Sequence, residues 1–371
     1  MRIVLWIRNF FYQLCLISIV ILILALSRSL LPTLSGIEDI FPSNISRHFN
    51  AAEFNSWRIQ RANFTLEHIS KSFNLTNEDN QVISIIIIAS GREGYFLTQV
   101  IAAFIEILQT SNLYASISIC NVSTVENEEI DRLSHIVPII KPIKQFAYNF
   151  NKYEERLMKE SNDYWFCMNA THNSRYTLLI EDDALPVPAF DLLMRSVVDR
   201  MDNDQRLDFI KLYHPGHLRK IPYYFQVSII CLLISLLLTF AIWRHIAWLP
   251  LLLTFAFFVY HFDVYYTYQF FADIRYALTG SIYIAMSESC CTPAVIYRTS
   301  KIPKMLDYFT MRAFTNRSAK DDILDEAPFI SRLTDTNLVI HIGYISAIRR
   351  RAVTLDVLKQ LRYRSQHTFP F

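Results

Sequence analysis

Three consecutive carboxylates follow a short apolar stretch in the middle of the chain. Tyr176–Ile180 is predicted to form a strand, and Glu181, Asp182 and Asp183 come directly after it, with Pro186 close behind to end the strand. Carboxylates crowded at a strand end repel one another, so we expect a cation among them. Their oxygens are ligands that Mg²⁺ and Mn²⁺ prefer. The pattern predicts a divalent metal site that carries a nucleotide diphosphate.

The three carboxylates are not expected to act alike. Alternate residues of an extended strand point the same way, so Glu181 and Asp183 should share a direction. We assign Asp183 to the metal, Glu181 to the metal or to a ribose or sugar hydroxyl, and Asp182 to a supporting role. The alternative is a solvated acidic turn, which is the commoner reason for such a triplet, but the preceding strand favours a site.

Three further residues could contribute to the chemistry. Transfer from a nucleotide diphosphate needs a separate carboxylate that deprotonates the acceptor hydroxyl. Asp321 and Asp322 are candidates at the start of a predicted helix, although acids are common there because they complement the helix dipole. His341, at the end of the last predicted strand, is a candidate ligand of the metal or the diphosphate. A structural role for a lone histidine is the alternative.

Alternating strands and helices must position these residues. The apolar run Val82–Ala89 is typical of a buried parallel strand; it breaks at Ser90–Gly94, and a helical pattern follows at Tyr95–Leu108. Further strands are expected at 115–120, 136–140, 176–180, 207–212, 277–285, 294–297 and 338–342, and further helices at 153–165, 190–201, 302–314 and from 320 to near 332. The order predicts an α/β fold with a mainly parallel sheet and a ligand crevice at the carboxyl ends of its strands.

The composition points to a membrane. The chain has 371 residues, of which 52% are hydrophobic, and a formal net charge of +2, so no basic surface for nucleic acid is indicated. Arg2 and Arg8 precede the apolar stretch Phe10–Leu26, and no small-residue cleavage signal follows it. We expect an uncleaved signal anchor with the bulk of the chain in the lumen. A cleaved signal peptide is the alternative.

Two more apolar runs lie inside the α/β pattern. Phe225–Trp243 and Ile246–Phe262 are separated only by Arg244 and His245, and tyrosines flank both outer ends. The lengths and the aromatic flanks predict a transmembrane helical hairpin rather than a buried pair of helices in a soluble core. Two crossings would return the chain to the lumen. The six N-x-[ST] triplets all fall in the parts expected to be lumenal, at Asn44, Asn63, Asn74, Asn121, Asn169 and Asn316.

These boundaries divide the chain into five parts. They are a cytosolic tail with the signal anchor at 1–31, a lumenal stem at 32–80, the first half of the α/β domain at 81–222, the hairpin at 223–268, and the second half at 269–371.

Four cysteines lie in the parts expected to be lumenal, where disulfides form. They are Cys120, Cys167, Cys290 and Cys291, which allow three pairings. We favour a Cys120–Cys167 bond and keep a strained bond between the adjacent Cys290 and Cys291 as the alternative for the second pair. A zinc site is a weaker rival, because no C-x-x-C spacing occurs.

Several motifs together resemble one known family, the Golgi GPI N-acetylgalactosamine transferases, which modify GPI anchors after their attachment to proteins. The motifs are ASGR at 89–92, CNVS at 120–123, LIEDDALP at 179–186, KLYHP at 211–215, ESCCTPA at 288–294, KDD at 320–322 and HIGYIS at 341–346. The N-terminal anchor and the inserted hairpin complete the resemblance, which spans nearly the whole chain.

The resemblance implies a GT-A-like glycosyltransferase fold that is split by the hairpin. It implies a Golgi membrane enzyme that uses UDP-GalNAc and Mn²⁺ (or Mg²⁺) and adds GalNAc in β linkage, with inversion, to the first mannose of the GPI glycan on GPI-anchored proteins. Asp321 is similar in position to the single base that inversion requires, although Asp322 is unexpected at its position and could exchange roles with it. The resemblance places uridine near the strand ends at Ala89, Arg92, Asn121 and Val122.

Two other functions remain as alternatives at this point. One is an N-acetylglucosaminyltransferase that acts on N-glycans, since such enzymes are similar in the acidic triplet and the late histidine motif. The other is a membrane cargo adaptor with an inactive GT-A-like body. The triplet argues against an adaptor, because its carboxylates would remain uncompensated without a metal.

Overall fold

The central strand of the fold is β1 (Ile83–Ala89), all seven residues of which are buried. Its side chains alternate between the two faces of the sheet: Ile83, Ile85 and Ile87 join one core cluster, and Ile86 and Ile88 join the other. A strand covered on both faces needs apolar residues at every position, which is why the sequence shows an unbroken run here.

The structure is a computed structural model, and it describes residues 51–69, 82–142, 152–170, 174–214, 279, 281–287, 291–316 and 319–343. The expected signal anchor and the expected transmembrane hairpin lie outside these ranges. In the part of the chain that the structure describes, no helix is both long and apolar enough to cross a membrane.

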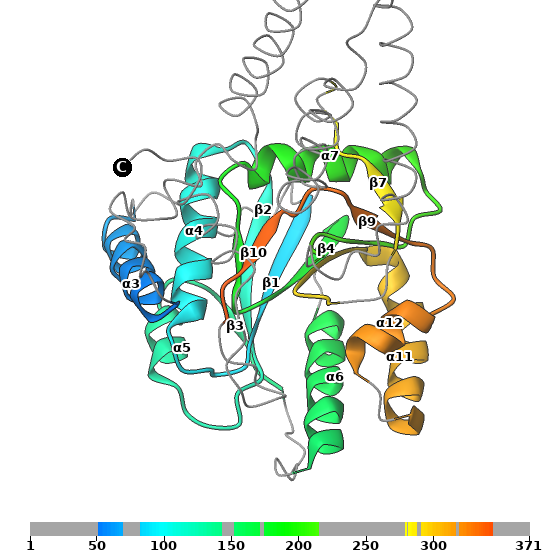
Figure 1. Cartoon of the computed structure of the whole chain (residues 1–371), viewed down its shortest axis with the longest axis horizontal. Helices are drawn as coiled ribbons and strands as arrows, with labels where there is room; N and C mark the ends of the chain where they lie inside the picture. The colour runs from blue at the N-terminus through cyan, green and yellow to red at the C-terminus, as the bar shows by residue number, and fades with distance from the viewer. Residues whose placement is uncertain are drawn as a thin grey trace, which may run out of the picture.

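Eight strands of the described residues form one sheet in the order β3-β2-β1-β4-β8-β6-β9-β7 (Figure 1). The strands β3, β2, β1 and β4 are parallel; β8 lies antiparallel between β4 and β6, β9 is parallel to β6, and β7 is antiparallel to β9. The sheet is therefore mainly parallel, as the sequence predicts. Apart from β1, its strands are β2 (Ala115–Asn121), β3 (Ile139–Ile140), β4 (Tyr176–Glu181), β6 (Phe209–Lys211), β7 (Ile284–Met286), β8 (Ala294–Arg298) and β9 (Ser331–Thr334).

Helices cover both faces of the sheet (Figure 1). One core cluster contains residues of α4 (Phe96–Thr110), α5 (Glu128–Leu133) and α7 (Phe190–Asn203). The other contains residues of α6 (Tyr153–Asn169), α11 (Ile302–Asn316) and α12 (Lys320–Glu326). The helix α3 (Ala51–Glu67), within the expected stem, packs on α4, and Asn55 donates to the carbonyl of Gly94, in the turn before α4, at 3.0 Å. A single 3₁₀ turn, η2 (Thr299–Lys301), links β8 to α11.

The strand order reverses at β1, and this reversal places the site. β1 pairs with β2 on one side and with β4 on the other, all three parallel, so their carboxyl ends meet at one edge. The register sets Ala89 beside Asn121, and Ile88 beside Glu181. In open α/β sheets, ligands bind at such a switch point, outside the carboxyl ends of the strands.

The structure corrects three predictions about elements. Of the strand expected at 277–285, only the end lies in a strand, since β7 runs from Ile284 to Met286 and residues 281–283 are irregular. The helix expected from 320 to near 332 ends at Glu326, and Arg332 lies in the strand β9. Pro328 explains the early end, because the residue before a proline is forced out of the helical region, and Ala327 is extended with φ −68° and ψ 142°. The chain also pairs again after the acidic triplet: β5 (Ala184–Pro186) forms a two-stranded sheet with β10 (Val339–His341) despite its proline.

The Cys120–Cys167 disulfide, predicted from the sequence, is confirmed. It joins the end of β2 to α6 with a Cα–Cα distance of 5.7 Å, and both cysteines are buried. Cys291 is also disulfide-bonded, but its partner is not among the described residues, so the expected pairing with Cys290 stays a prediction.

We expect the double variant C120A/C167A to lose about 2–4 kcal/mol of stability, because the bond closes a loop between residues 47 apart and links the sheet to α6. Thermal unfolding of the full chain in detergent measures the loss. Wild-type protein treated with a reductant is the control and should shift in the same direction. An unchanged melting temperature in both would contradict the structural role of the bond.

Candidate active site at the carboxyl ends of β1 and β4

The acidic triplet spans the last residue of β4, Glu181, and the turn to β5, Asp182 and Asp183. Asp182 and Asp183 are 3% and 0% exposed, so this is not a solvated turn. Asp182 accepts hydrogen bonds from the Ser90 backbone N–H at 2.9 Å and from its hydroxyl at 2.8 Å. Asp182 thereby fixes the turn that follows β1 to the turn that follows β4. This contact agrees with the supporting role expected for it.

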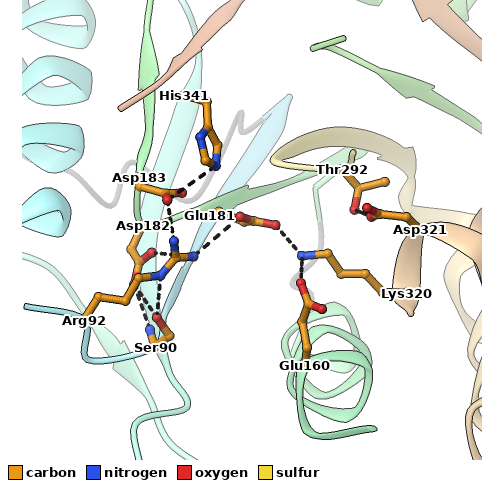
Figure 2. Close-up of polar contacts among 10 residues, drawn as sticks. All are labelled: Ser90, Arg92, Glu160, Glu181, Asp182, Asp183, Thr292, Lys320, Asp321 and His341. Atoms are coloured by element: carbon orange, nitrogen blue, oxygen red, sulfur yellow. Dashed lines mark hydrogen bonds and ion pairs between the residues drawn. The ribbon is translucent and has the colours of Figure 1, made fainter. Parts of the chain in front are cut away.

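The guanidinium of Arg92 lies among all three carboxylates (Figure 2). One of its nitrogens, Nη1, donates to Asp183 Oδ2. The other, Nη2, lies 3.1 Å from Asp182 Oδ1 and 3.5 Å from Glu181 Oε2. Arg92 belongs to the turn after β1, so the turns that follow two neighbouring strands meet through this one side chain. Its charge offsets part of the repulsion within the triplet.

His341 reaches the same place from the far end of the chain. The pairing of β10 with β5 sets His341 opposite Ala184, and the Ile342 N–H donates to the Asp183 carbonyl at 2.8 Å. His341 Nε2 is then 3.4 Å from Asp183 Oδ2. One ligand atom from each of Glu181, Asp183 and His341 lies within 4.8 Å of the others. The structure thus gathers the three residues that the sequence nominates for a metal.

The chemistry of this group fits Mn²⁺ or Mg²⁺. Two carboxylates and an imidazole are suitable donors for Mn²⁺, and carboxylates suit Mg²⁺ as well. Asp183 Oδ1 is buried and has no hydrogen-bond partner among the described residues. A buried carboxylate oxygen left in that state is costly, and a bound cation would satisfy it. Asp183 is therefore the member of the group whose surroundings point most directly to a metal.

Gly343 leaves room for the Asp183 carboxylate. A Cβ atom built at Gly343 would fall 2.0 Å from Asp183 Oδ2, closer than any real contact. We expect Gly343→Ala to displace the carboxylate and to weaken Mn²⁺ binding by about tenfold or more, since metal sites tolerate little displacement of a ligand. Mn²⁺ titration followed by electron paramagnetic resonance measures this. Unchanged affinity would mean that Asp183 does not hold the ion.

Charged neighbours set the ionisation of the triplet. Burial raises the pKa of Glu181, but the positive charges of Lys320 and Arg92 outweigh it and bring the pKa down to about 2. Glu181 is therefore ionised at neutral pH. Burial raises the pKa of Asp182 above its ordinary value, and the charge of Asp183 adds to this rise while Arg92 opposes it.

The two candidate bases sit differently on α12. Asp321 is partly buried, and its Oδ1 accepts a hydrogen bond from the Thr292 hydroxyl. Asp322 is exposed to solvent. A base must be held in place to take a proton from one particular hydroxyl. The held side chain, Asp321, suits that role better than its neighbour.

The residues expected near uridine lie at the ends of β1 and β2. Ala89 and Asn121 are paired in register, and the Val122 N–H donates to the Ala89 carbonyl at 3.0 Å. The Asn121 side chain accepts from the Ser123 N–H at 3.0 Å. These positions border the turn that carries Arg92, but none of these hydrogen bonds joins them to the acidic triplet.

Some participants were not singled out from the sequence. Ser90 orients Asp182, Thr292 holds Asp321, and Lys320 contacts Glu181. Each lies in or beside a motif that the sequence does show. Their roles depend on which strands become neighbours, and local spacing does not carry that information.

Fold and site together define an α/β protein with a candidate cation site at the switch point of its sheet. The GPI-N-acetylgalactosamine transferase PGAP4 family model matches residues 82–340, more than half of the chain. The chain belongs to this family and is a glycosyltransferase that transfers GalNAc, as the sequence resemblance implies. The family match favours this prediction over the N-glycan alternative.

Two solved structures of mannosyltransferases show weak similarity. One is the mannosyltransferase PcManGT from Pyrobaculum calidifontis in complex with GDP-Man and Mn²⁺, with 10% identity and a TM-score of 0.26, covering 51% of this chain and 48% of that one. The other is the mannosyltransferase Ktr4p from S. cerevisiae, with 12% identity and a TM-score of 0.31, covering 91% of this chain and 97% of that one. TM-scores this low do not define a common fold.

Proposed function

We propose that the chain transfers GalNAc from UDP-GalNAc to the first mannose of the GPI glycan on GPI-anchored proteins, in β linkage and with inversion. The enzyme would be a GT-A-like, multi-pass protein of the Golgi membrane with its catalytic part in the lumen. Membership of a family of GPI-N-acetylgalactosamine transferases supports the donor, the acceptor and the compartment. The linkage and the metal rest on the resemblance and on the chemistry of the site.

The observation that carries the proposal is the group formed by Glu181, Asp183 and His341 at the end of β4. These residues would hold Mn²⁺ or Mg²⁺, which when bound supplies charge stabilisation to the leaving diphosphate. Arg92, on the turn after β1, would add positive charge to the same side of the substrate. Ala89, Asn121 and Val122, at the neighbouring strand ends, would border the uridine.

Asp321 would take the proton from the mannose hydroxyl. Its carboxylate is held by the Thr292 hydroxyl, and it lies on α12, whose first residue contacts Glu181. A single base is all that an inverting displacement requires from the protein at the acceptor. Asp322 would face solvent and contribute little.

The expected hairpin would hold the active site close to the membrane that carries the GPI acceptor. A GPI glycan is tethered to the lumenal leaflet, so an enzyme pinned to the same surface gains effective concentration. Replacement of residues 223–268 by a soluble linker should spare UDP-GalNAc hydrolysis and abolish transfer to GPI in membranes. Equal transfer by both forms would contradict a role for the hairpin in orienting the site.

Mass spectrometry of GPI glycans tests the proposed function directly. Purified full chain in detergent, given UDP-GalNAc and a GPI-anchored protein, should add one GalNAc to the first mannose in a reaction that a chelator abolishes. Cells that lack the protein should lose the same residue from their GPI glycans. Unchanged glycans in such cells would refute the function. Binding of UDP-GalNAc that depends on metal, and that is lost in D183A, separates an enzyme from an inactive adaptor.

A further inference from the structure

Lys320 is a buried lysine at a position that two general rules disfavour. It is 4% exposed and is the first residue of α12. A cation at a helix N-terminus faces the positive end of the helix dipole. Burial of an ammonium group is costly unless carboxylates offset its charge. The position therefore calls for a specific ionic partner.

Two carboxylates on other elements supply that partner (Figure 2). The Lys320 ammonium contacts Glu181 Oε1, at the end of β4, and lies 2.9 Å from Glu160 Oε1, on α6. It also lies 5.2 Å from the centre of the Tyr164 ring. Burial lowers the pKa of Lys320, but the charges of Glu160 and Glu181 outweigh it and raise the pKa above its ordinary value. The side chain is therefore a permanent cation.

Lys320 stands between the two parts of the candidate site. Glu181 belongs to the group that can hold a metal. Asp321, the candidate base, is the next residue along the chain, and its carboxylate turns to Thr292. Figure 2 shows Lys320 reaching Glu181 and Glu160, with the Asp321–Thr292 pair beside it. Lys320 thus links α12, the helix that carries Asp321, to Glu181 of the metal group, by which we mean Glu181, Asp183 and His341.

We propose that Lys320 is a positioning residue that holds α12 against Glu181, and so sets Asp321 in a fixed place relative to the metal group, while its charge limits how tightly that group binds a divalent cation. The inference rests on the proposed function. It assigns Lys320 a role that acts through Glu181 and Asp321.

The two parts of the role predict opposite effects of one substitution. In K320M, α12 loses its ion pair with Glu181 at the end of β4. Asp321 is then held less firmly, so kcat for transfer should fall about tenfold or more. A positive charge beside the cation site is removed at the same time, so Mn²⁺ should bind about tenfold more tightly. K320R keeps the charge and most of the reach, and both quantities should stay within about threefold of wild type. General damage to the site would instead lower both kcat and the affinity for Mn²⁺.

The chain offers a matched control in a second buried lysine that contacts the same helix. Lys211, on β6, is fully buried and contacts Asp325 of α12. K211M therefore removes a second buried lysine that ties α12 to the sheet, at a point other than Glu181. We expect K211M to lower the melting temperature and to leave the Mn²⁺ affinity unchanged.

The experiment compares wild type, K320M, K320R and K211M as full chains in detergent, by Mn²⁺ titration and by GalNAc transfer. Tighter Mn²⁺ binding with a lower kcat in K320M alone supports the inference. Wild-type kcat in K320M, weaker Mn²⁺ binding in K320M, or the same pattern in K211M overturns it. If K320M fails to fold because Glu160 and Glu181 then repel, K320M/E160Q removes that repulsion and carries the same two expectations. A wild-type protein that neither binds Mn²⁺ nor transfers GalNAc refutes the proposed function instead.

Discussion

Replacement of Asp183 by asparagine should abolish Mn²⁺ binding and lower GalNAc transfer by about a hundredfold or more. The change keeps the shape of the side chain and removes its negative charge. Asp183 is fully buried, faces His341 and carries an oxygen without a hydrogen-bond partner among the described residues. If Asp183 holds the metal as proposed, its replacement removes charge stabilisation of the leaving group, an effect on the order of several kcal/mol.

The measurement is Mn²⁺ titration of the full chain together with transfer to a GPI-anchored acceptor. Asp202→Asn is a matched control, since this carboxylate pairs with Arg175 at 2.7 Å, away from the triplet. The control should bind Mn²⁺ and transfer GalNAc as wild type does. D183N with wild-type affinity and rate would show that the acidic triplet is structural and would remove the main support for a metal-dependent reaction.

Asp321→Asn should separate catalysis from donor binding. Without a base, transfer should fall about 10²–10⁴-fold, the usual contribution of general-base catalysis. Mn²⁺ affinity and the KM for UDP-GalNAc should change little, because Asp321 hydrogen-bonds to Thr292 and is not part of the metal group. Steady-state kinetics with the donor and acceptor varied in turn gives the two effects separately.

Asp322→Asn is the natural comparison, one residue along the same helix. Asp322 is exposed, so its loss should leave the rate within about threefold of wild type, as for most surface substitutions. The opposite result, an active D321N and an inactive D322N, would exchange the two roles. Equal and large losses in both would indicate that α12 tolerates no change in charge, and that neither residue alone is the base.

The central half of the fold could be predicted because its signals are local. The unbroken run of apolar residues in β1 and the apolar stretch of β4 each predict a buried strand, and the acidic triplet indicates where β4 ends. The Cys120–Cys167 disulfide could also be predicted from the sequence, because few other cysteines are available as partners. The end of α12 was predicted wrongly although Pro328 gave a usable signal.

The contacts that assemble the site could not be predicted from spacing. A strand ending near His341 was expected, but its pairing with the three-residue strand β5, which brings His341 to Asp183, was not, because the two strands lie far apart in the chain. Lys320 is part of the KDD motif, yet its contact with Glu181 depends on α12 packing beside β4. Such long-range pairings are set by the whole core, and a single sequence does not reveal them.

The strand order also constrains how the protein can be made. β8 lies between β4 and β6 in the sheet but follows both of them in the chain, after the segment that holds the expected hairpin. Until the ribosome has passed residue 298, the facing edges of β4 and β6 lack their partner, and unpaired strand edges invite aggregation. The metal group needs His341 as well, so it cannot form until still later. Truncated chains should therefore be degraded by cellular quality control rather than act as partly active enzymes.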